Sequence, residues 1–401
     1  MEASVITDSL RRHATSMWRQ LALASNWPLL AAVAALSGVG LLTIGSVEPG
    51  VAKTQALFLV VGFGAMTVFQ AVNYATLGRL AWPFYFLSLG LVLYTVLGAK
   101  MGLPFVPRIN GACNWIRIGP ASIQPAELMK ISYIMLLARW LRYRESQRTI
   151  KGLLVPAVLA AVPMLLILKQ PDLGTCIVFI PTTAAMLFVA GAKLKHFAMV
   201  IGAGLFLAPL LWLSGQPAVP VLKYGPDLVK QYQRDRVYAM FKNDENTLKG
   251  TGYQQHFGLA AMGSGGLAGK GAGNVPVGRK VPESQNDMIF VVVGEQFGFL
   301  GSLVVLAAYV VLFVAAMEVA MHTKEPFGRL VAVGITAALA GQTFVNLAVA
   351  MKLMPVTGVT LPFISSGGSS LIASFMAVGL LLNIGQHRPF LLYREAFSFD
   401  R

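Results

Sequence analysis

The chain has little charge, few acidic residues and almost no cysteine. Only 12% of its 401 residues are charged, about half the share found in soluble globular proteins. This shortage excludes a water-soluble enzyme of two or three domains. Two cysteines cannot build a disulfide framework. Five scattered histidines offer no metal-ligand spacing, so no metal site is predicted and no cofactor is evident.

The chain is instead rich in long apolar runs. Hydrophobic residues make up 56% of it, and about 20 consecutive apolar residues are enough to cross a bilayer. The runs cover residues 27–46, 54–71, 80–97, 125–141, 152–168, 174–191, 197–213, 300–321, 330–351 and 369–384. We therefore predict an all-α polytopic membrane protein with about ten transmembrane helices.

The basic residues indicate which loops face the cytoplasm. Lys and Arg exceed Asp and Glu by 15, which in a soluble protein would suggest nucleic acid. In a membrane protein it fits cytoplasmic loops rich in Lys and Arg, so no nucleic-acid partner is predicted. With the N-terminus inside, the short inner segments hold ten basic residues and the outer ones six. Both termini are therefore predicted to be cytoplasmic.

Five segments follow from these runs. Residues 1–26 form a cytoplasmic N-terminal segment, either an interfacial helix or a loose tail. Residues 27–213 hold helices one to seven, and 214–299 form a large extracytoplasmic loop. Residues 300–384 hold helices eight to ten, and 385–401 form a cytoplasmic tail. The large loop carries too many aromatic residues for a disordered linker, so we expect it to be ordered.

A glycine-rich stretch in that loop imitates a nucleotide-binding motif. Residues 264–270 resemble a P-loop, but the first position is serine and Gly271 follows Lys270. A P-loop needs Ser or Thr there to hold Mg²⁺. The stretch is better explained by tight turns or by close approach of the backbone to another group.

Two charged sites near the membrane segments have two interpretations each. Glu127 and Lys130 are three residues apart and share a helix face. They form either a structural ion pair or part of a site, because charge inside a membrane is expensive. Asp172 stands where the sixth window begins, and it either caps that helix or belongs to a site.

Asp287 and Glu295 flank an apolar stretch that is too short to span a membrane and ends before Gly298. Such a stretch suggests a re-entrant segment. Asp287 would then stand at the outer membrane boundary, where partial burial raises the pKa of a carboxyl group toward that of a general base. The alternative for Asp287 is a helix N-cap.

The segment 355–370 leads into the last window with several Ser and Gly residues. Free backbone N–H groups at a helix start, here near Gly367, can bind an anion. Capping of the helix by Ser369 is equally consistent with the pattern.

Together these motifs resemble the SEDS family (shape, elongation, division and sporulation), whose members include RodA and FtsW. The resemblance runs in one order from the first window to about residue 387. It includes segments 110–111, 115–116, 124–130, 170–175, 232–237, 263–267, 282–283, 287, 361–365 and 367–370. Residues 355–358 (Pro-Val-Thr-Gly) lean toward the RodA branch.

The resemblance implies an activity: a peptidoglycan glycosyltransferase that polymerises lipid II into glycan strands during cell elongation. Asp287 matches the family's essential aspartate and would be the catalytic base. The candidate substrate-binding residues are Asp172, Arg234, Arg236, Arg279, Lys280, Glu283, Gly367 and Ser369. Glu127, Lys130 and Glu295 would be structural or supporting, and the reaction leaves room for a divalent cation.

The resemblance also implies a location and partners. The protein would lie in the bacterial cytoplasmic membrane, with a class B penicillin-binding protein (a transpeptidase) and other elongation-complex membrane proteins as partners. Two other functions stay open: a lipid II flippase, and a non-catalytic scaffold for a transpeptidase. A flippase needs polar groups through the membrane, whereas Glu127 and Lys130 are the only charged pair well inside a window.

The sequence departs from the family pattern close to the expected base. The family has histidine and threonine where Gln285 and Asn286 stand, phenylalanine at Met288 and tyrosine at Ser366. Two further departures are Asn114, in place of arginine, and Gln296, in place of glutamate. These changes leave Asp287 in place but alter the groups around it.

The predicted topology can be tested with single cysteines. We expect an impermeant thiol reagent on intact cells to label Ser264→Cys and not Ser146→Cys, in a background where Cys113 is replaced, because 139–151 is the most basic short loop. Labelling at position 146 alone would reverse the assignment.

Overall fold

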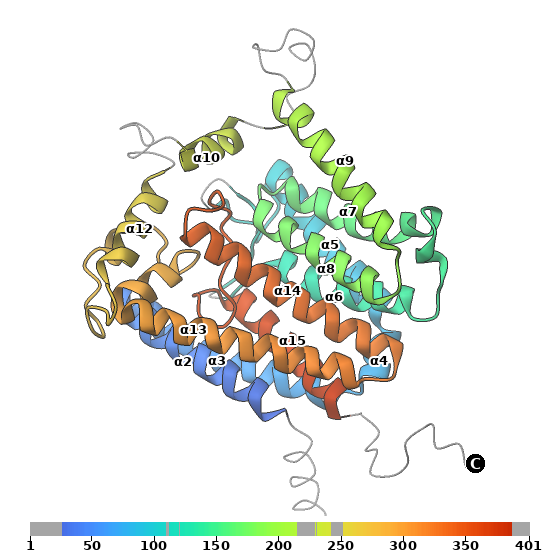
Figure 1. The fold of residues 1–401 in the computed structure, drawn as a ribbon, viewed down its shortest axis with the longest axis horizontal. Helices are drawn as coiled ribbons and strands as arrows, with labels where there is room; N and C mark the ends of the chain where they lie inside the picture. Colours follow the sequence, from blue (N-terminus) through green and yellow to red (C-terminus); the bar gives the residue numbers. More distant parts are fainter. Residues whose placement is uncertain are drawn as a thin grey trace, which may run out of the picture.

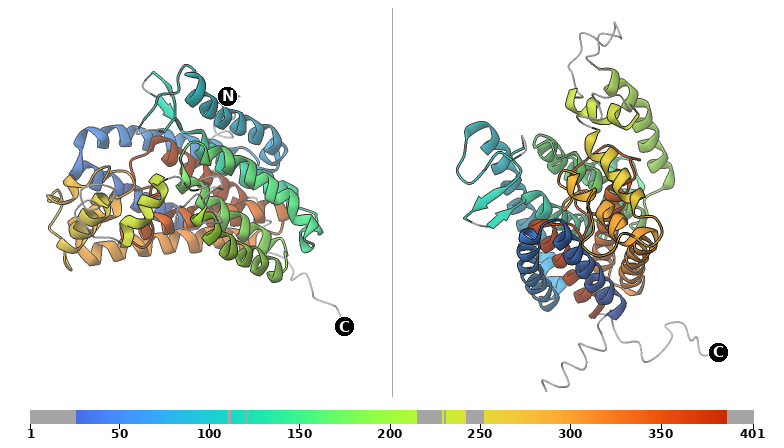
Figure 2. Two further views of the ribbon diagram at one scale, coloured as in Figure 1. Left: turned by 90° about the horizontal axis from the view of Figure 1, so that it is seen from above. Right: turned by 90° about the vertical axis from the view of Figure 1, so that its left-hand side faces the viewer.

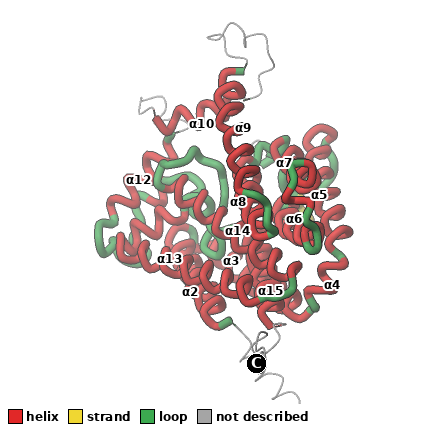
Figure 3. Tube along the Cα trace, turned by 45° about the vertical axis from the view of Figure 1, so that its right-hand side comes forward, coloured by secondary structure: helices red, strands yellow, loops and turns green. Residues whose placement is uncertain are grey.

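Long apolar helices make up most of the protein. The computed structural model describes residues 26–109, 112–119, 121–214, 229, 231–241 and 252–386. Its helices are α2 (Trp27–Val47), α3 (Pro49–Ala71), α4 (Tyr74–Arg79), α5 (Ala81–Met101), α6 (Pro125–Leu141), α7 (Leu154–Leu168), α8 (Leu173–Val189), α9 (Leu194–Leu213), α10 (Gln231–Phe241), α12 (Tyr253–Ser264), α13 (Ile289–His322), α14 (Pro326–Ala350) and α15 (Gly368–Gln386). Short 3₁₀ turns occupy Ser146–Arg148, Lys151–Leu153 and Gly278–Lys280. Figure 1 shows the helices side by side, and Figure 3 shows how much of the described chain is helical.

Each of the ten apolar windows coincides with one of these helices. Among the described residues, seven helical segments are long and apolar enough to cross a membrane, and α8 and α9 are shorter apolar helices. The integral membrane character predicted from composition is therefore supported, while the number of ten spans stays a prediction. The segments 1–25 and 387–401, with the expected N-terminal helix and the cytoplasmic tail, lie outside the described residues.

The helices α14 and α15 form the centre of the bundle. Both are buried over most of their length, and α15 packs chiefly against α3 while α14 packs against α8, α13 and α6. The contact with α3 is close because of glycine: a Cβ at Gly379 would lie 2.4 Å from the carbonyl oxygen of Met66. The outer helices expose apolar side chains such as Leu205 and Phe206 of α9, as expected for surfaces that face lipid.

A small β-hairpin is the part of the fold that the all-α prediction missed. Strands β1 (Ile116–Ile118) and β2 (Ala121–Ile123) pair antiparallel, and Figure 2 shows the hairpin projecting at the edge of the bundle. Strands of three residues are too short to produce a recognisable alternating pattern. The hairpin is attached to the start of α15, because the Ser369 hydroxyl accepts from Gln124 N–H (3.0 Å) and donates to the carbonyl of Ser122 (3.1 Å).

The described part of the large loop is ordered and largely helical. It contains α10 and α12, which lie at one side of the bundle in Figure 1. The buried side chain of Gln255 on α12 donates to the carbonyls of Val349 (3.1 Å) and Met354 (2.7 Å). The loop is thereby held against the end of α14.

The glycine-rich stretch is organised by a buried carboxylate. Glu295 is fully buried and accepts from the N–H groups of Val277 (3.1 Å) and Gly278 (2.6 Å). The ammonium of Lys270 lies 2.6 Å from the same carboxylate. The lysine that imitated a P-loop lysine is therefore part of an ion pair with Glu295, and the supporting role of Glu295 stays a prediction.

The helix α13 is two helices joined at a break. Gly298 has φ +66° and ψ −162°, a conformation that a side chain would strain. A Cβ at this position would also lie 2.3 Å from the backbone nitrogen of Gly269. The short apolar stretch expected before the eighth span is thus a helical segment that ends at this break, and Asp287 lies just before its start.

Candidate active site

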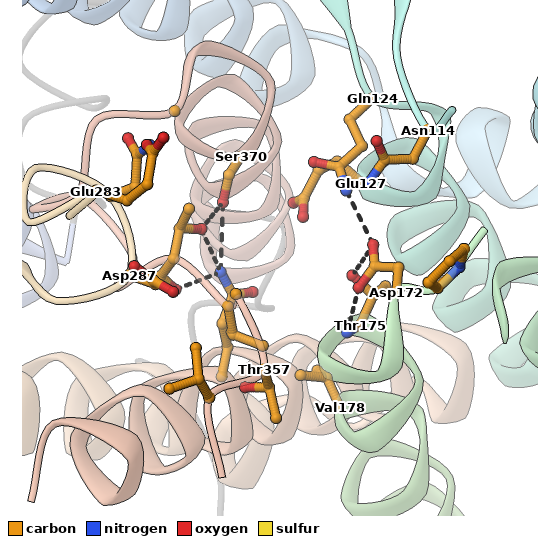
Figure 4. A pocket seen from close by; sticks show the side chains of 18 of the residues that line it. Asn114, Gln124, Glu127, Asp172, Thr175, Val178, Glu283, Asp287, Thr357 and Ser370 are labelled. Carbon is orange, nitrogen blue, oxygen red and sulfur yellow. Dashed lines mark hydrogen bonds between the residues drawn. The ribbon is translucent and has the colours of Figure 1, made fainter. Parts of the chain in front are cut away.

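A polar cavity of about 450 Å³ lies at one end of the bundle. It is bounded by α6, α8, α10, α12, α14 and the loops that precede β1, α8, α13 and α15. Figure 4 shows Asp287 and Glu283 on one side and Asp172, Gln124 and Asn114 on the other. The lining residues are Asn114, Trp115, Gln124, Glu127, Lys130, Pro171, Asp172, Thr175, Val178, Arg236, Gln254, Glu283, Asn286, Asp287, Gln342, Val356, Thr357, Gly358, Val359, Thr360, Ser366, Gly367 and Ser370.

Asp287 is a buried carboxylate on the first wall. Its exposed fraction is 7%, and burial raises the pKa of Asp287 from 3.8 to about 7, because the charged form loses water. The amide of Gln254 on α12 donates to Oδ1 at 2.9 Å and partly opposes this rise. A carboxyl group that titrates near neutral pH and opens onto a polar cavity can act as a general base.

The residues around Asp287 form a hydrogen-bonded rim. The amide of Asn286 donates to Glu283, and the hydroxyl of Ser366 donates to the side-chain oxygen of Asn286. The Ser366 N–H also donates to the carbonyl of Gln285 at 2.8 Å. Three of the positions that depart from the family pattern, 285, 286 and 366, are therefore direct neighbours, and their side chains and backbone bond to one another.

Glu127 and Lys130 form a buried ion pair on the second wall. Their charged atoms are 3.0 Å apart, and both side chains are at least 89% buried by area. The ammonium of Lys130 also donates to the amide oxygen of Gln342 on α14 at 2.7 Å. Both groups line the cavity, so the pair is placed where it can serve either the fold or a bound molecule.

Asp172 both caps a helix and lines the cavity. Its Oδ1 accepts from the Thr175 N–H (3.0 Å) at the start of α8, and its Oδ2 accepts from the Thr175 hydroxyl (2.9 Å) and from the amide of Gln124 (3.0 Å). Burial raises the pKa of Asp172, and the bonds from Thr175 oppose the rise. The two interpretations of this residue are therefore compatible.

The remaining predicted residues divide into two groups. Arg236 lines the cavity, and its guanidinium donates to the carbonyl of Val356 at 2.9 Å; Gly367 and Glu283 line it too. Arg279 does not line the cavity and instead donates to the carbonyl of Ser46 at the end of α2 (3.0 and 2.7 Å).

Lys280, Arg234, Ser369 and Glu295 are also absent from the cavity lining. Lys280 is exposed. The buried Arg234 donates to the carbonyl of Ser214 at 2.7 Å, and Ser369 attaches the hairpin. Ser369 lies inside α15, and its hydroxyl bonds to Gln124 and Ser122, so these contacts attach the hairpin and do not cap the helix as expected. Anion binding near Gly367 stays a prediction.

Several amides in and beside the cavity had not been expected from the sequence pattern. Gln342 and Asn346 lie inside the apolar window 330–351, and Gln254 lies on α12. A buried amide in a membrane segment is costly unless it is bonded, so Gln342 and Asn346 could have been found from that signal. Gln254 sits in a polar loop and gave none.

The described residues contain no cluster of three or more His, Cys, Asp or Glu side chains that could hold a metal. The cavity nevertheless carries charge of both signs. Its carboxyl groups are Asp287, Glu283, Glu127 and Asp172, and its cations are Lys130 and Arg236. Such a site can bind a polar molecule that bears both an anionic group and exchangeable hydroxyl groups.

Comparison with known proteins identifies the family. The family model described as "Cell cycle protein", covering FtsW, RodA and SpoVE, matches residues 14–389. The chain belongs to this family. This is the SEDS family that the motifs resembled, so the predicted membership is confirmed. The match does not distinguish the RodA branch from the others.

Relatives and solved structures of the SEDS family cover most of the chain. The Stage V sporulation protein E of Bacillus subtilis (strain 168) is 37% identical over 347 residues, which cover 84% of this chain and 87% of the relative. The probable peptidoglycan glycosyltransferase FtsW of Geobacter sulfurreducens is 35% identical over 342 residues, 83% of this chain and 84% of the relative. A chain from the structure titled "Structural coordination of polymerization and crosslinking by a peptidoglycan synthase complex" has a TM-score of 0.76 and 30% identity, with 92% and 99% of the two chains covered.

The burial of Asp287 predicts an unusual dependence of stability on pH. Because the pKa is higher in the folded than in the unfolded state, the folded protein holds the proton more tightly, and stability falls as pH rises from about 4 to about 7. Asp287→Asn removes this loss, on the order of a few kcal/mol. We expect its melting temperature at pH 8 to exceed that of the wild type, with exposed Glu145→Gln as the control. An Asn variant that melts lower than the wild type at pH 8 would contradict the assignment.

The Glu127–Lys130 pair can be separated into its structural and site components. Glu127→Gln leaves Lys130 with a neutral partner only, and breaking a buried pair costs about 3–5 kcal/mol. Glu127→Gln with Lys130→Met should recover most of the melting temperature, because no buried charge is then left without its counter-charge. The catalytic rate should stay low in this double variant, since both groups line the cavity. A double variant no more stable than the worse single would show that the charges are not coupled.

Proposed function

We propose that this chain is a peptidoglycan glycosyltransferase that polymerises lipid II. The observation that carries the proposal is the buried Asp287 carboxyl group, which faces a cavity whose other wall holds the Lys130 ammonium, in a chain of the SEDS family. Several relatives bear the name probable peptidoglycan glycosyltransferase FtsW.

The chemistry needs a base and a place for a leaving anion. In its ionised form, Asp287 takes the proton from the 4-hydroxyl of the acceptor sugar. That oxygen forms a bond to the anomeric carbon of the donor sugar, and the bond from this carbon to the pyrophosphate oxygen breaks. The products are a longer glycan and undecaprenyl pyrophosphate.

The leaving pyrophosphate requires positive charge or N–H donors. Lys130 and Arg236 are the cations of the cavity, and Gly367 lies directly before the N-terminus of α15, where backbone N–H groups are unpaired within the helix. These groups replace Arg279 and Lys280 as the first candidates, because the latter two do not line the cavity. Glu283 and Asp172 can accept hydrogen bonds from sugar hydroxyls.

The location and the partner follow the same proposal. We infer that the protein lies in the cytoplasmic membrane with both termini inside, so that the cavity opens on the outer side where the glycan is built. A class B penicillin-binding protein is the proposed partner. A solved relative of this chain was described as part of a peptidoglycan synthase complex that coordinates polymerization and crosslinking.

We further propose a role in cell elongation, on the basis of the Pro-Val-Thr-Gly segment at 355–358. The test is rescue of bacterial cells depleted of RodA in one strain and of FtsW in another. Recovery of rod shape in the first strain, without restored division in the second, is the expected result. Rescue of division alone would assign the chain to the other branch.

The activity depends on Asp287. Purified wild-type protein with fluorescent lipid II should give polymer on a gel, at a rate that rises with pH through about 7, since the base must lose its proton. Asp287→Asn keeps the shape but not the base, so the rate should fall by about 10²–10⁴-fold. Glu318→Gln, which lies near the far end of α13, is the matched carboxyl control. A near-normal amount of polymer from Asp287→Asn would exclude Asp287 as the general base. Transfer of lipid II across vesicle membranes without polymer would favour a flippase.

A further inference from the structure

Two buried amides stand one turn apart on α14. Gln342 and Asn346 are 3% and 1% exposed, and residues four apart share one face of a helix. Each amide reaches a different wall of the cavity. Neither is accounted for by the chemistry proposed above.

Gln342 holds the wall of the Glu127–Lys130 pair. Its amide oxygen accepts from the Lys130 ammonium at 2.7 Å. Its amide nitrogen donates to the carbonyl of Thr360 at 2.9 Å and lies 3.3 Å from the Ser370 hydroxyl. Lys130 is therefore fixed with respect to α14 and to the start of α15.

Asn346 holds the wall of the base. Its amide nitrogen donates to the backbone carbonyl of Asp287 and to that of Val359, both at 2.7 Å. Its amide oxygen has no partner among the described residues. The side chain thus acts only as a donor, and both of its N–H groups are used to tie the Asp287 segment to α14.

The segment between the walls is tied to the same helix face. Val359 and Thr360 are consecutive, and their carbonyls are bonded by Asn346 and Gln342 respectively. Both residues line the cavity. The rise from one amide to the next is about 6 Å along the helix axis, a length that the rigid helix does not change.

We propose that Gln342 and Asn346 are positioning residues that set the separation of Lys130 and Asp287 across the cavity. This inference rests on the proposed function, because it assigns the two walls to one reaction. Neither amide acts on the substrate through this role: Gln342 acts through the ammonium, and Asn346 acts through the backbone that carries the base.

The two amides can be distinguished because only Asn346 bonds to the segment that carries Asp287. Asn346→Leu leaves the Asp287 carbonyl unpaired, so the segment shifts to regain water, and hydration of the carboxyl group lowers its pKa toward the ordinary value. Gln342→Met releases Lys130 and leaves the Asp287 segment tied. Thr343→Val is the matched control, since that buried hydroxyl donates only to Leu339 within α14 (2.9 Å).

The experiment measures polymerisation and thermal unfolding of the full-length variants across pH 5–9. With Asn346→Leu we expect the pH at half-maximal rate to fall by about one unit. The drop of the melting temperature with rising pH should then level off at a pH that is lower by a similar amount. Gln342→Met should slow the reaction by about 10-fold or more through misplacement with both pH ranges unchanged. Thr343→Val should alter neither.

Three outcomes would overturn the inference. The first is an Asn346→Leu protein whose pH ranges match the wild type and whose rate falls only with its folded fraction. The second is an equal pH shift in Gln342→Met. If Asn346→Leu does not fold, the milder Asn346→Ser replaces it, and an unshifted pH range there is the third.

Failure of the proposed function has a different signature. Wild-type protein without polymer would remove that function, and the thermal data would still decide whether Asn346 alone controls the titration of Asp287.

Discussion

The arrangement of the cavity depends on keeping one carboxyl group, Asp287, out of water. Burial of an ionisable group costs free energy unless its surroundings compensate, and here the side-chain donor to the carboxylate, within the described part of the chain, is the amide of Gln254. The backbone around it is instead held firmly, by Asn346 from α14 and by Ser366 from the loop before α15. The raised pKa of Asp287 is therefore kept because the backbone that carries the side chain is fixed, while the carboxylate itself is not paired in a salt bridge with any of the described residues.

Elsewhere the same chain treats buried charge in the opposite way. Glu295 is surrounded by two N–H donors and the Lys270 ammonium, as is typical for a carboxylate whose role is structural. Glu127 lies between these extremes, since it has one ammonium partner and a cavity beside it. The degree to which each carboxylate is compensated separates the group that can exchange a proton from the group that stabilises the fold.

The sequence predicted most of the helices because membrane segments need a continuous apolar run, and each of the ten runs coincides with a helix. It also singled out Asp287, Asp172, Glu127 and Lys130, since charge beside apolar sequence is conspicuous. It could not separate Arg236, which lines the cavity, from Arg279, which caps the end of α2, because both are basic residues in one loop. The hairpin and the amide contacts of Gln254 depend on packing between segments far apart in the chain, and no local pattern reveals them.

The break at Gly298 divides α13 into two parts. The part before it lies beside the cavity, and the longer part after it is apolar. The residues after the break belong to a helix that is long and apolar enough to cross a membrane, whereas the residues from Ile289 to the break pack against α12 and the glycine-rich stretch. A continuous helix would force both parts onto one axis. With the break, the axis of the segment that follows Asp287 is set independently of the axis of the long apolar part.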